Sequence, residues 1–206
     1  MPATRTEKDH ATKRQELIDV AEALFASQGF EATPVSDIVK LAGVSQGTFY
    51  WYFPTKDHVL LAIFEKISAE AGACLRHLAD PTLSIMARGD RALDDLHESY
   101  LRHQAIWQLF RSRSAHVETL RARHELNRES AHVPLAAMLR GGIARGELAM
   151  QTDPETTARL IVTLVEEIYD DDQLANDPAV IPTLKGMLRA ILAPTGGHKP
   201  PGWSTP

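Results

Sequence analysis

The sequence has 206 residues, of which 44% are hydrophobic and 24% are charged, which is enough for the core of one large domain or two small ones. The formal net charge of −5 argues weakly against a nucleic-acid-binding protein, because such proteins usually carry a basic surface. The single cysteine, Cys74, excludes an intramolecular disulfide and fits a reducing compartment. No apolar run reaches the roughly 18 residues of a membrane-spanning helix, and the N-terminus lacks the apolar core of a signal peptide, so we expect a soluble, cytoplasmic protein.

The N-terminal region is predicted to contain a flexible arm followed by a helix. Residues 1–11 are polar, and we expect no fixed structure there. Gly29 is expected to end the helix that follows, since glycine readily adopts the left-handed conformation found after many helices. The helix is predicted over residues 12–27 because apolar residues recur there with the spacing of one helical face, at Leu17, Val20, Ala21, Leu24 and Phe25.

Two short helices are predicted next. The first is expected to begin at Pro34, with Thr33 as its N-cap, and to end before Gly43. Ser45 is expected to cap the second, which ends at residue 52, and helical spacing turns its Phe49 inward.

The rest of the chain also has helical periodicity. Pro134 is expected to kink or break one long helix, and the last helix begins at either Pro178 or Pro182. A loose tail is expected after Pro194, and no segment alternates as a strand does, so the predicted fold class is all-α. The further helices are predicted from Thr55 to before residue 81, over 90–108, over about 117–144, from Asp153-Pro154 through Ile168, and up to about Leu192.

The two short helices form a helix-turn-helix. Gly43 supplies the tight turn between them, and small neighbours let the helices approach each other. On the second helix, Gln46 and Thr48 have side chains that can hydrogen-bond base edges, and Gly47 permits a close backbone approach to DNA.

Three adjacent aromatic residues, Tyr50, Trp51 and Tyr52, follow on the same helix. One interpretation is that Trp51 and Tyr52 pack against neighbouring residues, and the other is that the hydroxyl and indole groups of the three donate to phosphates. Residues 1–58 contain six Lys and Arg against eight Asp and Glu, a net charge of −2. Affinity for DNA must therefore come from the positions of the charges and not from their sum. Phosphate contacts are also expected from the basic residues near the N-terminus, namely Arg5, Lys8, Lys13 and Arg14.

This part of the sequence resembles the N-terminal signature of the TetR family of transcriptional regulators. The resemblance rests on Gly29-Phe30-Glu31-Ala32-Thr33, Ile38, Ala42-Gly43-Val44-Ser45-Gln46-Gly47-Thr48-Phe49-Tyr50 and Tyr52-Phe53-Pro54-Thr55-Lys56-Asp57. Pro34 stands where the family often has a hydroxyl residue, which puts one phosphate contact in doubt, and Val39 replaces a usual alanine.

The resemblance implies a homodimer that binds a double-stranded, near-palindromic operator and represses transcription until a small-molecule effector releases it. It implies an arm at 1–11, a DNA-binding domain at 12–58, an effector-binding and dimerisation domain at 59–193 that dimerises through 153–193, and a tail at 194–206. Lys56 also begins a helix, where the backbone favours a phosphate. The DNA-contacting residues that the resemblance implies are Thr33, Gln46, Gly47, Thr48, Tyr50, Trp51, Tyr52 and Lys56.

The effector is expected to be small and apolar or amphipathic, because mostly apolar side chains with a few polar groups line typical ligand sites. The same residues also fit an ordinary core, and a DNA-binding regulator without an effector is the alternative function. The expected lining is Met86, Leu93, Leu96, His97, Tyr100, Leu101, Trp107, Phe110 and Met138.

Catalysis, metal binding and a cofactor are not expected. The sequence contains no phosphate-binding loop, no nucleophile elbow and no pair of histidines with metal-ligand spacing. An acidic cluster at Glu166, Glu167, Asp170, Asp171 and Asp172 is interpreted either as a solvated helix end or as a partner for arginines of the facing subunit or for a cationic ligand.

Overall fold

The computed structural model describes residues 5–150 and 152–192, and within these ranges every regular segment is a helix. The all-α fold class is thus confirmed. The helices are α1 (Arg5–Gln28), α2 (Val35–Leu41), α3 (Gln46–Tyr52), α4 (Lys56–Cys74), the 3-10 helix η1 (Leu75–Ala79), α5 (Ile85–Ser114), α6 (Glu118–Ala144), α7 (Pro154–Asp170), α8 (Asp172–Ala175) and α9 (Val180–Leu192).

The chain folds into two units that are interleaved in sequence. Unit 1 contains the chain up to Glu70 together with Leu101–His124, and unit 2 contains Ala71–Tyr100 and the chain from Glu125 onward. Helices α4, α5 and α6 therefore each contribute to both units. These units divide the chain differently from a boundary at residue 58.

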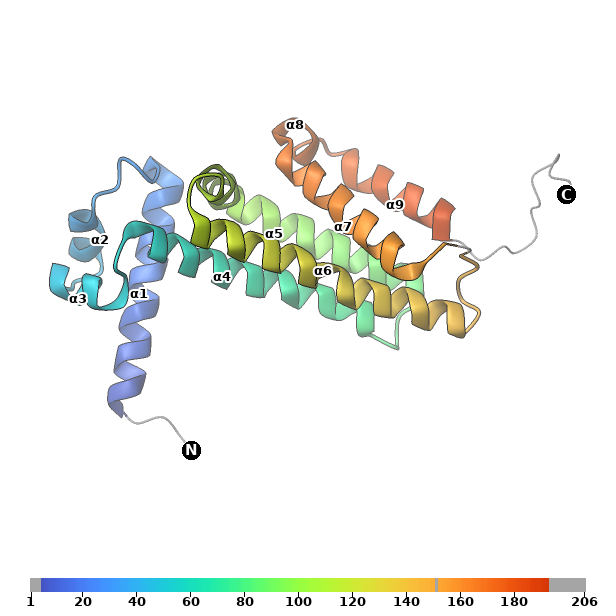
Figure 1. Ribbon diagram of the computed structural model, residues 1–206, viewed down its shortest axis with the longest axis horizontal. Helices are drawn as coiled ribbons and strands as arrows, with labels where there is room; N and C mark the ends of the chain where they lie inside the picture. Colours follow the sequence, from blue (N-terminus) through green and yellow to red (C-terminus); the bar gives the residue numbers. More distant parts are fainter. Residues whose placement is uncertain (1–4, 151, 193–206) are drawn as a thin grey trace, which may run out of the picture. The chain divides into compact units, whose positions relative to one another are not determined.

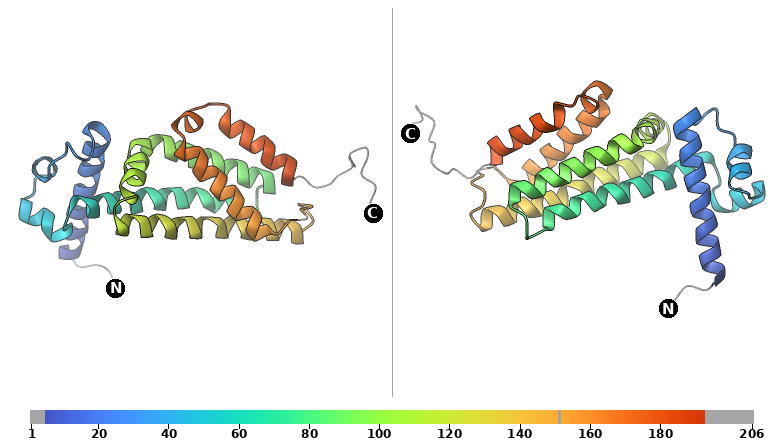
Figure 2. Two further views of the ribbon diagram at one scale, coloured as in Figure 1. Left: turned by 45° about the horizontal axis from the view of Figure 1, so that its top comes forward. Right: turned by 180° about the vertical axis from the view of Figure 1, so that it is seen from behind.

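In unit 1, α2 and α3 lie against one side of α1 (Figures 1 and 2). The hydrophobic core joins these helices to the first half of α4, to the end of α5 and to the beginning of α6. Phe64 of α4 stacks on Phe110 of α5 with 3.5 Å between the ring centroids. Side chains that are no more than 3% exposed include Leu17, Ile18, Phe25, Ile38, Phe49, Phe53, Leu60, Phe64, Ile106, Phe110 and Leu120.

In unit 2, α7 and α9 lie side by side and are joined through α8 (Figures 1 and 2). The Asp153 carboxylate accepts a hydrogen bond from the Thr156 amide at 2.7 Å, which confirms the predicted start of α7. One core cluster contains Leu78, Ile85, Ala136, Met138, Leu139, Ala158 and Leu192, and a second contains Leu93, Ile168 and Leu184.

Several predicted boundaries were wrong. Helix α1 begins at Arg5 rather than at residue 12, because its polar first turns contain good helix formers and because His10 contacts α3. Helix α6 continues through Pro134, where the buried Ala136 and Leu139 that follow hold the helix against the core of unit 2. Helix α9 begins at Val180, between the two candidate prolines. The expected tail from residue 194 lies outside the described residues.

Candidate DNA-binding surface and effector region

The turn of the helix-turn-helix has the predicted geometry. Gly43 has a φ of +64°, a left-handed conformation that favours glycine. The Ser45 hydroxyl accepts a hydrogen bond from the Thr48 amide at 3.1 Å and lies 2.8 Å from the Thr48 hydroxyl. Phe49 is fully buried. The cap and the buried ring together fix which face of α3 points outward.

The outer face of α3 is exposed over most of its length. Gln46 and Gly47 are exposed, and the side chains of Tyr50 and Trp51 are 50% and 68% exposed. Large apolar groups are costly to expose, so this pair is a candidate contact surface. Tyr52 differs, because its hydroxyl donates to the His10 carbonyl oxygen at 3.1 Å and lies 3.0 Å from His10 Nδ1. In this structure Tyr52 packs against α1, and its hydroxyl is engaged by His10.

Two of the expected DNA contacts, Thr33 and Lys56, have their side chains turned inward in this structure. Thr33 is fully buried and is not the N-cap of α2; its hydroxyl donates to the Gly29 carbonyl oxygen at 2.6 Å. The Lys56 ammonium donates to the carbonyl oxygens of Phe30 and Thr33 at 2.7 and 3.0 Å, and it lies 4.4 Å from the centroid of the Phe30 ring. Lys56 therefore holds the turn between α1 and α2 rather than projecting toward a phosphate.

We predict that Lys56→Ala lowers the stability of the protein by about 1–3 kcal/mol, because it removes the ammonium donor from two carbonyl groups, of which that of Phe30 also accepts from the Thr33 amide. The slope of operator affinity against salt concentration should stay unchanged. Urea denaturation and binding at two salt concentrations measure both quantities. Lys40→Ala, which removes an exposed lysine from α2, is the control. Equal stability of the two variants would contradict the inward role of Lys56.

Cations from outside the first 58 residues offset the acidity of the helix-turn-helix region. Arg113 of α5 forms two hydrogen bonds with the Asp57 carboxylate, at 2.6 and 3.1 Å, and one with Glu31 at 2.9 Å. Lys66 of α4 pairs with Asp19 at 2.7 Å and with Glu22 at 2.9 Å. Burial raises the pKa of Asp19, but hydrogen bonds from Lys66 and Gln15 outweigh it and leave the pKa lowered. These ion pairs neutralise part of the net negative charge of residues 1–58, which had argued against DNA binding.

The residues predicted to line an effector site do not form a single cluster. Trp107 and Phe110 belong to unit 1, where both pack on Phe64. Met138 is 7% exposed in the first core cluster of unit 2, together with the half-buried Met86. Leu93 is buried in the second cluster, Leu96 is half-buried, and Leu101 is 44% exposed.

A smaller polar and aromatic cluster remains in unit 2. Tyr100 donates a hydrogen bond to the Tyr169 carbonyl oxygen at 3.0 Å, and their rings stack with 4.3 Å between centroids. The ring of His97 stacks on that of Tyr169, with 6.0 Å between the ring centroids. Its Nδ1 is buried without a hydrogen-bond partner among the described residues. Burial lowers the pKa of His97, although Asp94 opposes the shift. No role for Tyr169 was predicted from the sequence, because this residue lies within the acidic segment 166–172.

The acidic segment is paired and capped within unit 2. Glu166 lies 2.9 Å from Arg128, and burial nevertheless raises the pKa of Glu166. The Asp171 carboxylate accepts hydrogen bonds from the amides of Gln173 and Leu174 and so caps α8. Among the described residues, no group of three His, Cys, Asp or Glu side chains is placed to hold a metal ion, and no helix has the length and apolarity to cross a membrane.

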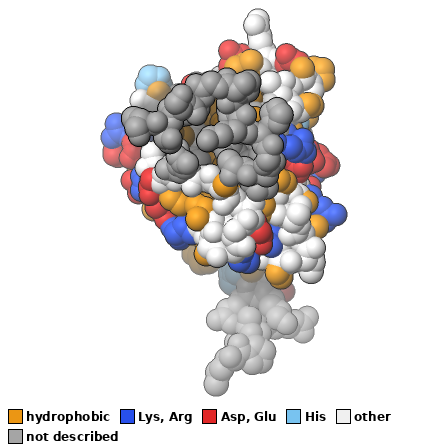
Figure 3. Space-filling model, turned by 90° about the vertical axis from the view of Figure 1, so that its right-hand side faces the viewer, with side chains coloured by type: hydrophobic (Ala, Val, Ile, Leu, Met, Phe, Trp, Pro, Cys, Tyr) orange, Lys and Arg blue, Asp and Glu red, His pale blue; other side chains and the backbone are white. Residues whose placement is uncertain are grey.

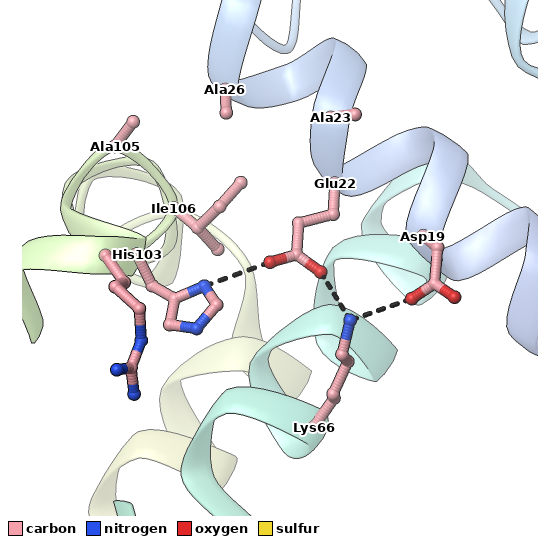
Figure 4. A pocket seen from close by; sticks show the side chains of 9 residues that line it. Asp19, Glu22, Ala23, Ala26, Lys66, His103, Ala105 and Ile106 are labelled. Atoms are coloured by element: carbon pink, nitrogen blue, oxygen red, sulfur yellow. Dashed lines mark hydrogen bonds and ion pairs between the residues drawn. The ribbon is translucent and has the colours of Figure 1, made fainter. Parts of the chain in front are cut away.

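A hollow of about 490 Å³ lies in unit 1 beside α1, α4 and α5 (Figure 4). None of the predicted effector residues lines it. Its walls combine small apolar side chains with charged ones, namely Asp19, Glu22, Ala23, Ala26, Lys66, Arg102, His103, Ala105 and Ile106.

Comparisons with known proteins agree with this fold. The sequence pattern of the family described as "Bacterial regulatory proteins, tetR family" matches residues 17–63. The HTH-type transcriptional regulator YvdT of Bacillus subtilis (strain 168) is 30% identical over 167 residues, which cover 77% of this chain and 81% of that protein. HTH-type transcriptional regulator AcrR of Shigella flexneri is 36% identical over 70 residues, which cover 34% of this chain and 33% of that protein.

Among solved structures, the SmeT–triclosan complex matches with a TM-score of 0.71 and 22% identity, over 95% of this chain and 98% of that one. That match supports the fold. The match to YvdT extends well beyond the helix-turn-helix, and the family pattern covers α2, α3 and parts of α1 and α4. The chain is therefore a member of the TetR family of bacterial transcriptional regulators.

Proposed function

We propose that this protein is a ligand-responsive repressor that binds a near-palindromic operator as a homodimer and is released by a small-molecule effector. The observation that carries the DNA-binding part is the exposed face of α3, which is held outward by the Ser45 cap and the buried Phe49. In helix-turn-helix proteins, the first turn of the second helix enters the major groove. Gln46 and Gly47 occupy that turn here, followed by Tyr50 and Trp51 as candidate phosphate contacts.

Gly47 offers a test in which stability and DNA binding should change independently. A Cβ atom at this position would meet only the Ser45 hydroxyl, at 3.7 Å, which is an ordinary contact. Because alanine favours helices more than glycine does, Gly47→Ala should leave stability unchanged or raise it by up to about 1 kcal/mol.

Operator affinity of Gly47→Ala should nevertheless fall about tenfold, since the added methyl group would stand between α3 and the bases. Fluorescence anisotropy with a labelled promoter fragment measures the affinity, and thermal unfolding measures the stability. Gly89→Ala is the matched control, because a Cβ atom at Gly89 of α5 meets nothing within 4 Å. Full operator affinity in Gly47→Ala would contradict a close approach of α3 to DNA.

Dimerisation is proposed to use the outer faces of α7 and α9. Two pairs of apolar side chains with i, i+4 spacing are exposed there: Leu160 and Leu164 are 66% and 41% exposed, and Met187 and Ile191 are 51% and 60% exposed. On the face shown in Figure 3, hydrophobic side chains lie among acidic and basic ones. An isologous interface would cover these exposed pairs with the same residues of a second copy.

The orientation of α9 supports this choice of face. Lys185 pairs with Asp94 and Arg189 pairs with Asp90, so these ion pairs hold one side of α9 against α5. Four apolar residues of the expected dimerisation segment 153–193, Ile168, Ile181, Leu184 and Leu192, are buried within the protomer and are not available to a partner. Leu188 packs against both core clusters of unit 2, so a charge there would disrupt the fold and would be a poor test of dimerisation.

Two experiments separate the repressor from its alternatives. A gel shift with the promoter region of the protein's own gene tests DNA binding and would fail for an enzyme. A thermal-shift screen separates an effector-responsive regulator from one without an effector, because a ligand that binds only the native state raises its stability. The His97–Tyr100–Tyr169 cluster supports an effector with an aromatic or amphipathic body. A bound compound that left operator affinity unchanged would contradict release by an effector.

A further inference from the structure

The ring of His103 lies between two carboxylates that come from two other helices. Nδ1 is 3.0 Å from Glu22 Oε1 of α1, and Nε2 is 3.1 Å from Glu70 Oε2 of α4. All three residues belong to unit 1. The side chains of His103 and Glu22 are each 15% exposed, and that of Glu70 is 42% exposed. Figure 4 shows the His103–Glu22 contact at the wall of the hollow.

The chemistry of the two contacts selects the charged form of the ring. An ionised carboxylate only accepts hydrogen bonds, and a neutral imidazole has a single N–H donor. A neutral ring therefore satisfies one of the two contacts and places a nitrogen lone pair against the other carboxylate. The imidazolium ion donates to both at once, in charge-assisted hydrogen bonds.

The groups around the ring carry both signs of charge. On α1, Glu22 and Asp19 share the Lys66 ammonium of α4, and Glu70 is the second acid on α4. On α5, Arg102 lines the same hollow. Because Glu22 accepts from Lys66 as well as from His103, loss of the His103 contact leaves Glu22 paired with Lys66 and removes one contact from Glu70.

His103 also occupies a special place in α5. The backbone leaves helical geometry at this residue, with φ −114° and ψ 15°, three residues after the last residue of unit 2 in this helix. The ring thus ties the second half of α5 to α1 and α4 directly after the break. Helix α1 packs on α2 of the helix-turn-helix, so the tie reaches the helices that position α3.

We propose that His103 is a proton-dependent clamp, which as an imidazolium ion holds α1 and α4 to α5 and keeps the helix-turn-helix in the arrangement that binds the operator. The clamp contributes when the ring is charged, because only the charged ring can donate to both carboxylates. The neutral ring keeps its N–H toward Glu22, the more buried carboxylate, and no longer donates to Glu70. The polar tie between α4 and α5 at His103 is then lost, while the stacking of Phe64 on Phe110 remains.

Glu70→Gln distinguishes this clamp from a merely structural contact. A glutamine amide both donates and accepts, so it can satisfy either a charged or a neutral ring. Operator affinity of the parent protein should fall about fivefold or more as the ring loses its proton. Glu70→Gln should retain the affinity measured for the protonated parent and lose most of this pH dependence. His103→Gln should bind more weakly than the parent and show the same affinity throughout the series.

The experiment combines operator binding with ¹⁵N NMR of the histidine rings across one pH series, kept above about pH 5.5 so that carboxylates stay ionised. His116→Gln is the control, since His116 is an exposed histidine of unit 1, and it should follow the parent protein. A Glu70→Gln profile identical to that of the parent would overturn the clamp. A His103 ring that stays neutral while affinity changes would do the same.

This inference rests on the proposed DNA-binding function, and the two fail in different ways. If the parent protein binds no operator at any pH, the proposed function is wrong. The clamp is then decided by thermal unfolding in the same series, because the melting temperature of the parent should fall with loss of the ring proton while that of Glu70→Gln should not. A parallel fall in both proteins would overturn the clamp on its own.

Discussion

Leu164→Glu is expected to convert the dimer into monomers and to lower operator affinity by a factor on the order of 10² to 10⁴. A dimer binds its second half-site as an intramolecular event, and a monomer loses that advantage. Leu164 is 41% exposed on α7, so the protomer tolerates a charge there, whereas a two-fold interface would bury two such charges against apolar partners. Analytical ultracentrifugation gives the oligomeric state, and anisotropy gives the affinity.

Leu126→Glu is the matched control for this experiment. Leu126 is an exposed leucine of α6, with 55% of its side chain accessible, and it lies outside the proposed interface. It should remain dimeric and bind the operator as the parent protein does. Circular dichroism checks that both variants keep their helices. A Leu164→Glu protein that is folded and still dimeric would remove α7 from the interface.

Gln46→Ala is expected to cost about 1–3 kcal/mol in each half-site and to relax base preference at one position of each half-site. Gln46 is the first residue of α3 and is exposed, so its amide is well placed to read a base edge. Thr48 is a weaker candidate, because its hydroxyl lies 2.8 Å from that of Ser45. Its replacement should affect the cap of α3 as well as base preference.

Tyr50→Phe provides the contrast, since it removes only a hydroxyl group from a side chain that is 50% exposed. A phosphate contact carries no direct sequence information, so this variant should weaken binding to all sequences alike. Selection of binding sites from a randomised operator measures the base preference of each variant. If Tyr50→Phe changed the preferred bases and Gln46→Ala did not, the proposed orientation of α3 would be wrong.

The sequence was sufficient wherever structure depends on neighbours along the chain. The turn at Gly43, the Ser45 cap and the buried Phe49 each follow from residues within one or two helical turns. The exposed half of α3 could be predicted for the same reason. The start of α7 at Asp153-Pro154 belongs to this group as well.

What the sequence did not reveal depends on partners that are far apart along the chain. Lys56 donates to a carbonyl group 26 residues away, and His103 meets a carboxylate 81 residues away. No local periodicity encodes such contacts. The proposed effector lining failed as a single cluster because residues at helical spacing on α5 enter two different units on either side of residue 101.

The interleaving of the two units has a consequence for recombination between relatives. The first 58 residues do not contain the whole core that surrounds the helix-turn-helix, because α4 residues such as Leu60 and Phe64, together with Ile106, Phe110 and Leu120 of α5 and α6, complete it. A chimera that exchanges only those residues would pack one parent's α1 and α3 against aromatic and aliphatic side chains selected with the other parent's sequence. Grafting a new operator specificity onto this protein therefore requires residues 59–70 and 101–124 to be transferred together with the first 58 residues.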